Sequence, residues 1–119
     1  MAAIPGLIHL DEVPWEPFGG QTKEVFRKSL SARALPPGFR AVLTMVKPGG
    51  EFPEHVDPYS HIFYVLEGEG KAWFDGQTVP LRKGISLTIA AGQRHGYRNA
   101  TRADLFFITL NIPEGREGR

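Results

Sequence analysis

The chain has 119 residues, is 41% hydrophobic and carries a formal net charge of +1, which suits one globular domain. Its basic residues are scattered, which argues against a nucleic-acid partner, and no apolar run approaches the ~20 residues that span a bilayer, so we expect no membrane partner. We predict a cytoplasmic protein. Cysteine is absent, so any bound metal must be held through nitrogen and oxygen.

The first half of the chain predicts an irregular arm followed by two strands. Residues 1–20 contain several prolines and end in a glycine pair, and we expect one short strand over 7–10. Strands are then predicted over 22–30 and 39–46, with turns at 35–38 and 47–50.

The second half predicts a series of short strands. An apolar strand covers 62–66, and Asp75-Gly76 between 71–74 and 78–81 is a strong hairpin signal. Further strands are expected over 85–90, 95–98 and 105–112, before a polar tail at 114–119. Eight to ten short strands without a helical period indicate an all-β, antiparallel barrel or sandwich.

The last strand is apolar on both faces, as Phe106-Phe107-Ile108 shows. One face can line a barrel, and the other must be covered. A second copy of the chain could cover it, which predicts a homodimer, or the N-terminal arm could cover it within one subunit.

Three of the four histidines fall into one pattern with a carboxylate. His55, Asp57 and His61 stand at positions i, i+2 and i+6, which share one face of a strand, and His95 can join them from another strand. Such a set of nitrogen and oxygen donors predicts a metal site. His9 lies outside the pattern, and we expect it to be structural.

These residues resemble the two motifs of the cupins. Pro48-Gly49-Gly50 leads to His55 and Asp57, then His61 follows after three residues and Gly68 after six more. The second motif is similar to the run from Gly84 through Ala90-x-Gly92 and His95 to Asn99, with Ala90 in place of the usual proline. The resemblance implies a cupin-type jelly-roll β-barrel over 21–113, with a metal ion in its mouth.

The ligand positions depart from the usual cupin set of His, His, Glu and His. Asp57 stands at a histidine position and His61 at the glutamate position, so the chain is similar to small single-domain cupins with four histidines, apart from Asp57. An aspartate oxygen reaches roughly 1 Å less far than a histidine nitrogen, so Asp57 binds the ion directly or through a water. We expect a divalent ion, with Fe, Mn or Cu favoured over Zn or Ni.

Strand alternation predicts the wall of the pocket. Phe63 and Val65 should face inward with His61, and Tyr97 with His95. Arg40, Arg94 and Arg98 are the nearby cations that could meet a phosphate. The floor is expected to come from one of two alternating sets, either Val42, Thr44 and Val46 or Ala41, Leu43 and Met45.

A mostly apolar pocket beside a metal ion favours a small aromatic or hydrophobic substrate. The function predicted from the sequence is an oxygenase-type oxidoreductase, such as a dioxygenase, with Tyr97 and Tyr59 as acid/base or hydrogen-bonding groups. The alternatives are a redox-neutral isomerase or lyase, and a module that binds a metal and a small molecule without catalysis.

Overall fold

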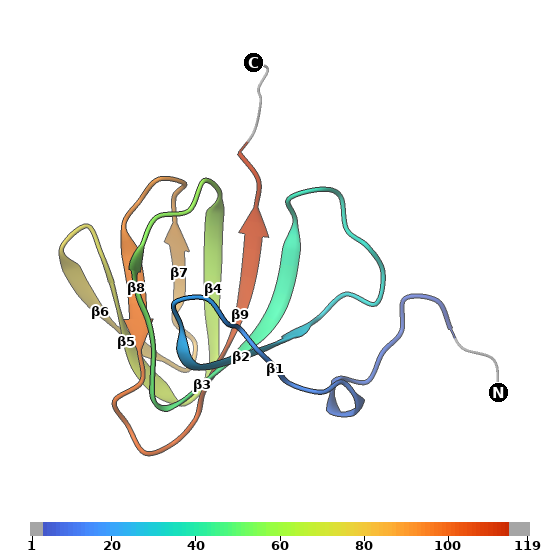
Figure 1. The fold of residues 1–119 in the computed structure, drawn as a ribbon, viewed down its shortest axis with the longest axis horizontal. Helices are drawn as coiled ribbons and strands as arrows, with labels where there is room; N and C mark the ends of the chain where they lie inside the picture. Colours follow the sequence, from blue (N-terminus) through green and yellow to red (C-terminus); the bar gives the residue numbers. More distant parts are fainter. Residues whose placement is uncertain (1–3, 115–119) are drawn as a thin grey trace.

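A computed structural model describes residues 4–114, and it shows one strongly curled antiparallel sheet (Figure 1). Most of the predicted tail lies outside the described residues. No α-helix occurs within residues 4–114, and no helix there is long and apolar enough to cross a membrane. The elements in chain order are the 3₁₀ helix η1 (Leu10–Glu12), β1 (Glu16–Pro17), β2 (Lys23–Ser29), β3 (Arg40–His55), β4 (Ser60–Glu67), β5 (Glu69–Phe74), β6 (Gln77–Arg82), β7 (Ser86–Ile89), β8 (His95–Arg98) and β9 (Leu105–Ile112).

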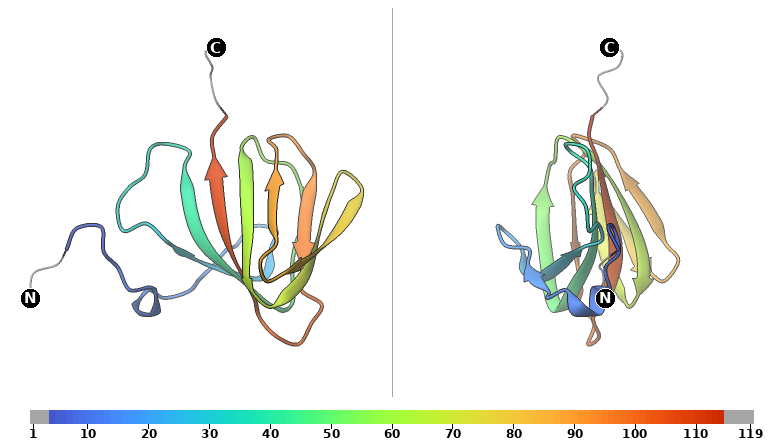
Figure 2. Two further views of the ribbon diagram at one scale, coloured as in Figure 1. Left: turned by 180° about the vertical axis from the view of Figure 1, so that it is seen from behind. Right: turned by 90° about the vertical axis from the view of Figure 1, so that its right-hand side faces the viewer.

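The strands lie side by side in the order β6-β5-β8-β3-β9-β4-β7, while β2 pairs with β3 and β1 pairs with β2. The sheet curls into a half-open barrel, and the residues before η1 extend away from it (Figures 1 and 2). Neighbours in the sheet are mostly distant in sequence, as in a jelly roll. The predicted all-β barrel is confirmed, whereas its division into an arm over 1–20 and a barrel over 21–113 stays a prediction.

Strand β3 is longer than the sequence indicated, and the turn predicted at 47–50 is wrong. The chain runs through this segment as one continuous strand without reversing, and Gly49 within it adopts a positive φ of 82°, which glycine tolerates. The Gly49 N–H donates to the Asn99 carbonyl at 2.8 Å, and the Asn99 N–H donates to the Gly50 carbonyl at 2.9 Å. Here β3 changes partner from β9 to β8, which carries its end to the mouth of the barrel.

Several other sequence predictions can be compared directly. The strand predicted over 7–10 is wrong, because η1 begins at Leu10, and the His9 side chain accepts a hydrogen bond from the Asp11 N–H. The hairpin at Asp75-Gly76 is confirmed, with φ values of 50° and 77° that suit a tight two-residue turn. The last strand spans the predicted residues.

The core fills one end of the barrel. Across β2, β3 and β9, Val25 faces Val46 and Val46 faces Leu105, and all three are buried. Asn99 is fully buried beside them and donates to the carbonyls of Val46 and Ala103, both at 2.8 Å. The other end of the same strands is left open for a cavity.

The N-terminal segment covers part of the outer face of the sheet. The Trp15 ring lies 6.1 Å from the Phe106 ring, and the Lys28 ammonium lies 4.7 Å above Trp15. The same ammonium donates to the Leu10 carbonyl at 2.7 Å, which ties the segment to β2. The arm of the same chain thus covers Phe106, one of the two alternatives that the sequence left open.

Candidate metal centre

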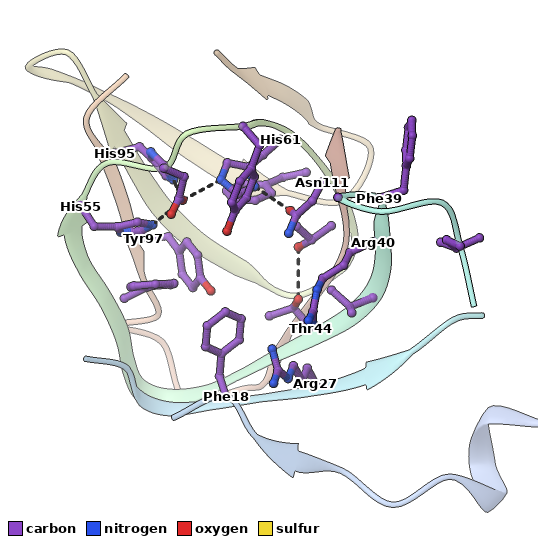
Figure 3. A pocket seen from close by; sticks show the side chains of 18 of the residues that line it. Phe18, Arg27, Phe39, Arg40, Thr44, His55, His61, His95, Tyr97 and Asn111 are labelled. Carbon is purple, nitrogen blue, oxygen red and sulfur yellow. Dashed lines mark hydrogen bonds and ion pairs between the residues drawn. The ribbon is translucent and has the colours of Figure 1, made fainter. Parts of the chain in front are cut away.

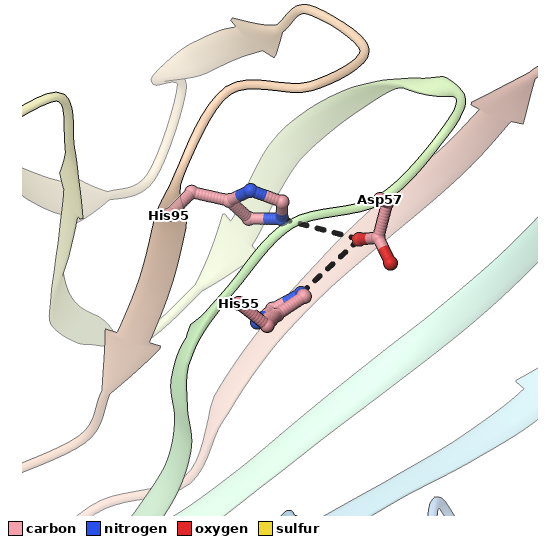
Figure 4. Close-up of side chains that lie close together, drawn as sticks. All are labelled: His55, Asp57 and His95. Carbon is pink, nitrogen blue, oxygen red and sulfur yellow. Dashed lines mark ion pairs between the residues drawn. The ribbon is translucent and has the colours of Figure 1, made fainter.

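The structure brings together all four predicted metal-binding residues. His55 ends β3 and pairs in register with His95 on β8, while Asp57 follows in the loop to β4 (Figure 4). His61 lies on β4. The pairing of β3 with β8 shifts register between Phe52 and His55, as at a β-bulge, near the mouth of the barrel.

Three imidazoles converge on one carboxylate oxygen. The Oδ2 atom of Asp57 lies 2.8 Å from Nε2 of His61, 3.1 Å from Nε2 of His55 and 3.4 Å from Nε2 of His95. The ligand atoms of His55, Asp57 and His95 all lie within 4.8 Å of one another, and His61 reaches the same oxygen from β4 (Figure 3). The cluster offers three nitrogen donors and one oxygen donor.

Each imidazole is oriented by a hydrogen bond from its other nitrogen. Nδ1 of His55 donates to the Pro53 carbonyl and Nδ1 of His95 donates to the Gln93 carbonyl, both at 2.8 Å. Nδ1 of His61 donates to Oδ1 of Asn111, also at 2.8 Å. A proton on Nδ1 leaves the lone pair on Nε2, the nitrogen that faces Asp57 in all three rings.

His95 is the most deeply buried of the three rings. Its Nε2 atom has no hydrogen-bond partner within residues 4–114, although buried polar atoms in proteins are nearly always paired. Burial lowers the pKa of His95, and this effect outweighs the hydrogen bond to Gln93 that raises it. The ring therefore favours its neutral form, in which Nε2 can bind a metal ion.

The distances also fit a shared ion. An ion about 2.1 Å from a nitrogen and an oxygen places these atoms about 3.0 Å apart at an octahedral angle and about 3.4 Å apart at a tetrahedral angle. The separations of 3.1 Å for His55 and 3.4 Å for His95 lie in this range, and the 2.8 Å for His61 is slightly shorter. The reach of Asp57 is sufficient because the loop after β3 brings its backbone toward the histidines. The residues therefore fit a divalent metal ion.

The cluster lies at one end of a cavity of about 670 Å³. Phe63 and Tyr97 line it as predicted, whereas Val65 belongs to the core beneath. On β3 the inward set is the one that contains Val42 and Thr44. The ring of Phe52 stacks on His55 with centroids 3.8 Å apart, so an aromatic wall adjoins the ligands.

Both predicted tyrosines line the cavity beside the cluster. Burial raises the pKa of Tyr97 far above its ordinary value, and the nearby Asp57 charge adds to the effect. Burial and the Asp57 charge also raise the pKa of Tyr59, with Arg40 acting in the opposite direction. Both phenols therefore keep their protons at neutral pH and can donate hydrogen bonds.

The cavity is more polar than the sequence indicated. Its wall includes Thr44 and Thr109, whose hydroxyls lie 3.2 Å apart. Of the three arginines proposed from the sequence, Arg40 lines the cavity, while Arg94 pairs with Glu54 at 3.7 Å outside it. Arg98 is exposed and does not line the cavity.

Arg27 is a cavity residue that the sequence reasoning missed. It lies two residues after the buried Val25 on β2 and pairs across the strands with Thr44, so it shares their inward face. Alternation along β2, counted from Val25, was the signal that could have found it.

Known proteins share this sequence pattern and fold. A family model described as Cupin domain (Cupin_2) matches residues 42–111, more than half of the chain. The polyketide synthase CurC of Streptomyces cyaneus is 43% identical over 58 residues, which make up 48% of this chain and 38% of that protein. Protein SchB of Streptomyces halstedii is 41% identical over 63 residues, or 52% of this chain and 45% of that protein.

The match thus spans less than half the length of either curated relative. Among solved structures, the polyketide cyclase RemF from Streptomyces resistomycificus superposes with a TM-score of 0.79 at 25% identity. That comparison covers 93% of this chain and 81% of RemF.

Proposed function

The chain belongs to the cupin domain family, and we propose that it is a metal-dependent, redox-neutral enzyme that closes a ring in a small polyketone. The observation that carries this proposal is the convergence of three imidazole nitrogens and one carboxylate oxygen at the end of a cavity lined by aromatic rings. A cavity of about 670 Å³ is of the size that holds small organic molecules.

In this proposal His55, Asp57, His61 and His95 hold a divalent ion. A set of three imidazoles and one carboxylate suits Fe, Mn, Cu, Zn or Ni, and the donor types alone do not separate them. When bound, such an ion supplies Lewis-acid polarisation of a substrate carbonyl. The hydrogen bonds at the three Nδ1 atoms keep the rings aimed at the ion.

The names of the relatives favour cyclisation over oxygenation. CurC is called a polyketide synthase and RemF a polyketide cyclase, and neither name supports the oxygenase that the sequence suggested. Ring closure in a polyketone removes a proton from carbon beside one carbonyl and forms a carbon–carbon bond to another carbonyl carbon. The carbonyl oxygen takes up this proton and becomes a hydroxyl group, which can leave as water together with a second hydrogen from the same α-carbon, so no oxidant is required.

Two groups of residues assist in different ways. Tyr97 and Tyr59 are protonated donors beside the cluster, and each can donate a hydrogen bond to a carbonyl oxygen as negative charge develops on it. Phe52 and Phe63 present aromatic surface that can hold a flexible chain in a folded shape.

The test uses protein loaded separately with each metal and a linear triketone ester as substrate. The expected result is ring closure faster than the spontaneous reaction, with a product that has lost one water and with no uptake of O₂. Metal-free protein and His55→Ala are the controls. Oxygen uptake matched to turnover would favour the oxygenase, and tight binding without any change in the ligand would favour a binding module.

We also propose that the protein is a cytoplasmic homodimer. The outward faces of β4 and β9 expose a group of apolar side chains that the N-terminal segment does not conceal, and burying them between two copies removes them from water. The group consists of Tyr64, Leu66, Leu110 and Ile112.

A further inference from the structure

The cavity has a second polar end, away from the imidazoles. Arg27 and Arg40 line it, and Figure 3 shows them on the other side of the cavity from His55 and His95. The proposed chemistry at the metal cluster uses neither arginine.

The strand register fixes the spacing between these two ends. Arg40 pairs with Asn111 across β3 and β9, and Asn111 pairs with His61 across β9 and β4. The backbones of Arg40 and His61 are therefore two strand spacings apart, about 10 Å. A small molecule inside the cavity of about 670 Å³ can therefore touch both ends.

The Arg27 guanidinium is held in place by an aromatic ring. Its central carbon lies 4.9 Å from the centroid of Phe18, which is also a cavity residue. Stacking on a ring fixes the plane of a guanidinium and leaves its N–H groups for hydrogen bonds at the edge. Neither Arg27 nor Arg40 forms an ion pair with a carboxylate within residues 4–114.

The surroundings of the two arginines are electropositive. A second cavity of about 310 Å³ shares both arginines with the first and is bordered also by Arg33, Ser29 and Ser31. Glu16, the cross-strand neighbour of Arg27, is the one carboxylate on that border, against three guanidiniums. In the first cavity Asp57 is the single carboxylate of the lining, and it belongs to the metal cluster.

We propose that Arg27 and Arg40 bind a carboxylate of the substrate, so that the natural ligand is a keto acid whose carbonyl end meets the metal cluster and whose acid end meets the arginines. A planar carboxylate matches the paired N–H groups of a guanidinium, and the aromatic walls between the two ends suit the carbon chain. This inference rests on the proposed function for the role of the carbonyl end only.

The test compares 4-acetylbenzoate with its uncharged amide, 4-acetylbenzamide, by calorimetry on metal-free protein and on zinc-loaded protein. The acid should bind about tenfold tighter than the amide, or more, in both forms, because hydrogen bonds to charged groups are the strong ones. Arg27→Gln and Arg40→Gln should each reduce this preference, and the double variant should abolish it. Arg40→Lys should retain part of it, since lysine keeps the charge without the fork.

Arg102→Gln is the matched control, because Arg102 is exposed and does not line either cavity. Thermal melting of each variant checks that the fold is intact. An equal affinity for acid and amide in the wild type would overturn the proposal. So would an acid preference that survives in the double variant, since the carboxylate would then bind elsewhere, or inorganic phosphate that competes better than the acid.

The outcome separates the two proposals. Loss of the acid preference in metal-free variants tests the arginines without any catalysis. Ring closure of an uncharged triketone tests the metal cluster without the arginines.

Discussion

Replacing Asp57 by asparagine removes one negative charge from the point where three imidazoles meet, at nearly unchanged side-chain size. The separations of 3.1 and 3.4 Å from Oδ2 to Nε2 of His55 and His95 are those expected when the atoms share an ion, and the 2.8 Å to His61 is slightly shorter. We therefore predict that Asp57 binds the metal directly.

The size of the loss distinguishes direct binding from binding through water. Changing a residue that only supports a ligand typically costs 10–100-fold in metal affinity. Removing a charged direct ligand should cost more than about 100-fold, which corresponds to more than about 2.8 kcal/mol. Competition with a coloured chelator at neutral pH measures the affinity of both proteins for Zn²⁺.

Asp11→Asn serves as the control, since that side chain is 90% exposed and lies outside the cluster. Far-ultraviolet circular dichroism verifies that both variants are folded. A loss of less than about 100-fold would refute direct binding. Unchanged affinity together with lost turnover would assign Asp57 instead to proton transfer, as the one carboxylate that lines the main cavity.

Three further predictions concern stability and assembly. Asn99→Ala removes a side chain that makes four hydrogen bonds in the core, and it should lower the free energy of unfolding by about 3 kcal/mol or more, as urea denaturation would measure. Asn99→Asp should also be destabilised, because it places an oxygen against two carbonyls. Burial raises the pKa of Tyr97, so above about pH 10 the unfolded chain loses this proton while the native protein keeps it, and stability should fall with rising pH. Tyr97→Phe should show a shallower fall in the same denaturation series, and an unchanged slope would contradict the assignment. Leu110→Glu puts a charge on the exposed apolar face and should convert the dimer into a monomer in analytical ultracentrifugation. Phe106→Glu should mainly loosen the N-terminal segment that contains Trp15. A wild-type protein that is already monomeric would contradict the dimer proposal.

The convergence of three histidines and Asp57 was predictable because its signal is local. His55, Asp57 and His61 are close in sequence on and beside strands, where side chains alternate with a fixed period. His95 could be added because its motif has a recognisable spacing. The tight turn at Asp75-Gly76 was equally local, since both residues tolerate positive φ.

The sequence predictions were wrong for segments whose conformation depends on the strand with which they pair. The segment 47–50 contains proline and two glycines and looks like a turn, but Gly49 and Gly50 bond to Asn99, which lies about fifty residues further along the chain. The turn preference of neighbouring residues gives no information about a hydrogen-bond partner so far away in the sequence. The short strand β1 was missed for the same reason, since two residues become a strand here only by pairing with β2.

The sequence by itself determined the all-β fold, the family and the four residues of the His/Asp cluster, because alternation and motif spacing are properties of consecutive residues. Only the tertiary structure decided that Asp57 can reach the point where the imidazoles meet, because the loop after β3 sets the position of its backbone. It alone also placed Arg27 and Arg40 on one wall, because the curl of the sheet brings β2 and the beginning of β3 to face His55 and His95 across the cavity. Which side chains share a cavity depends on strand pairing, and strand pairing joins residues that the sequence holds far apart.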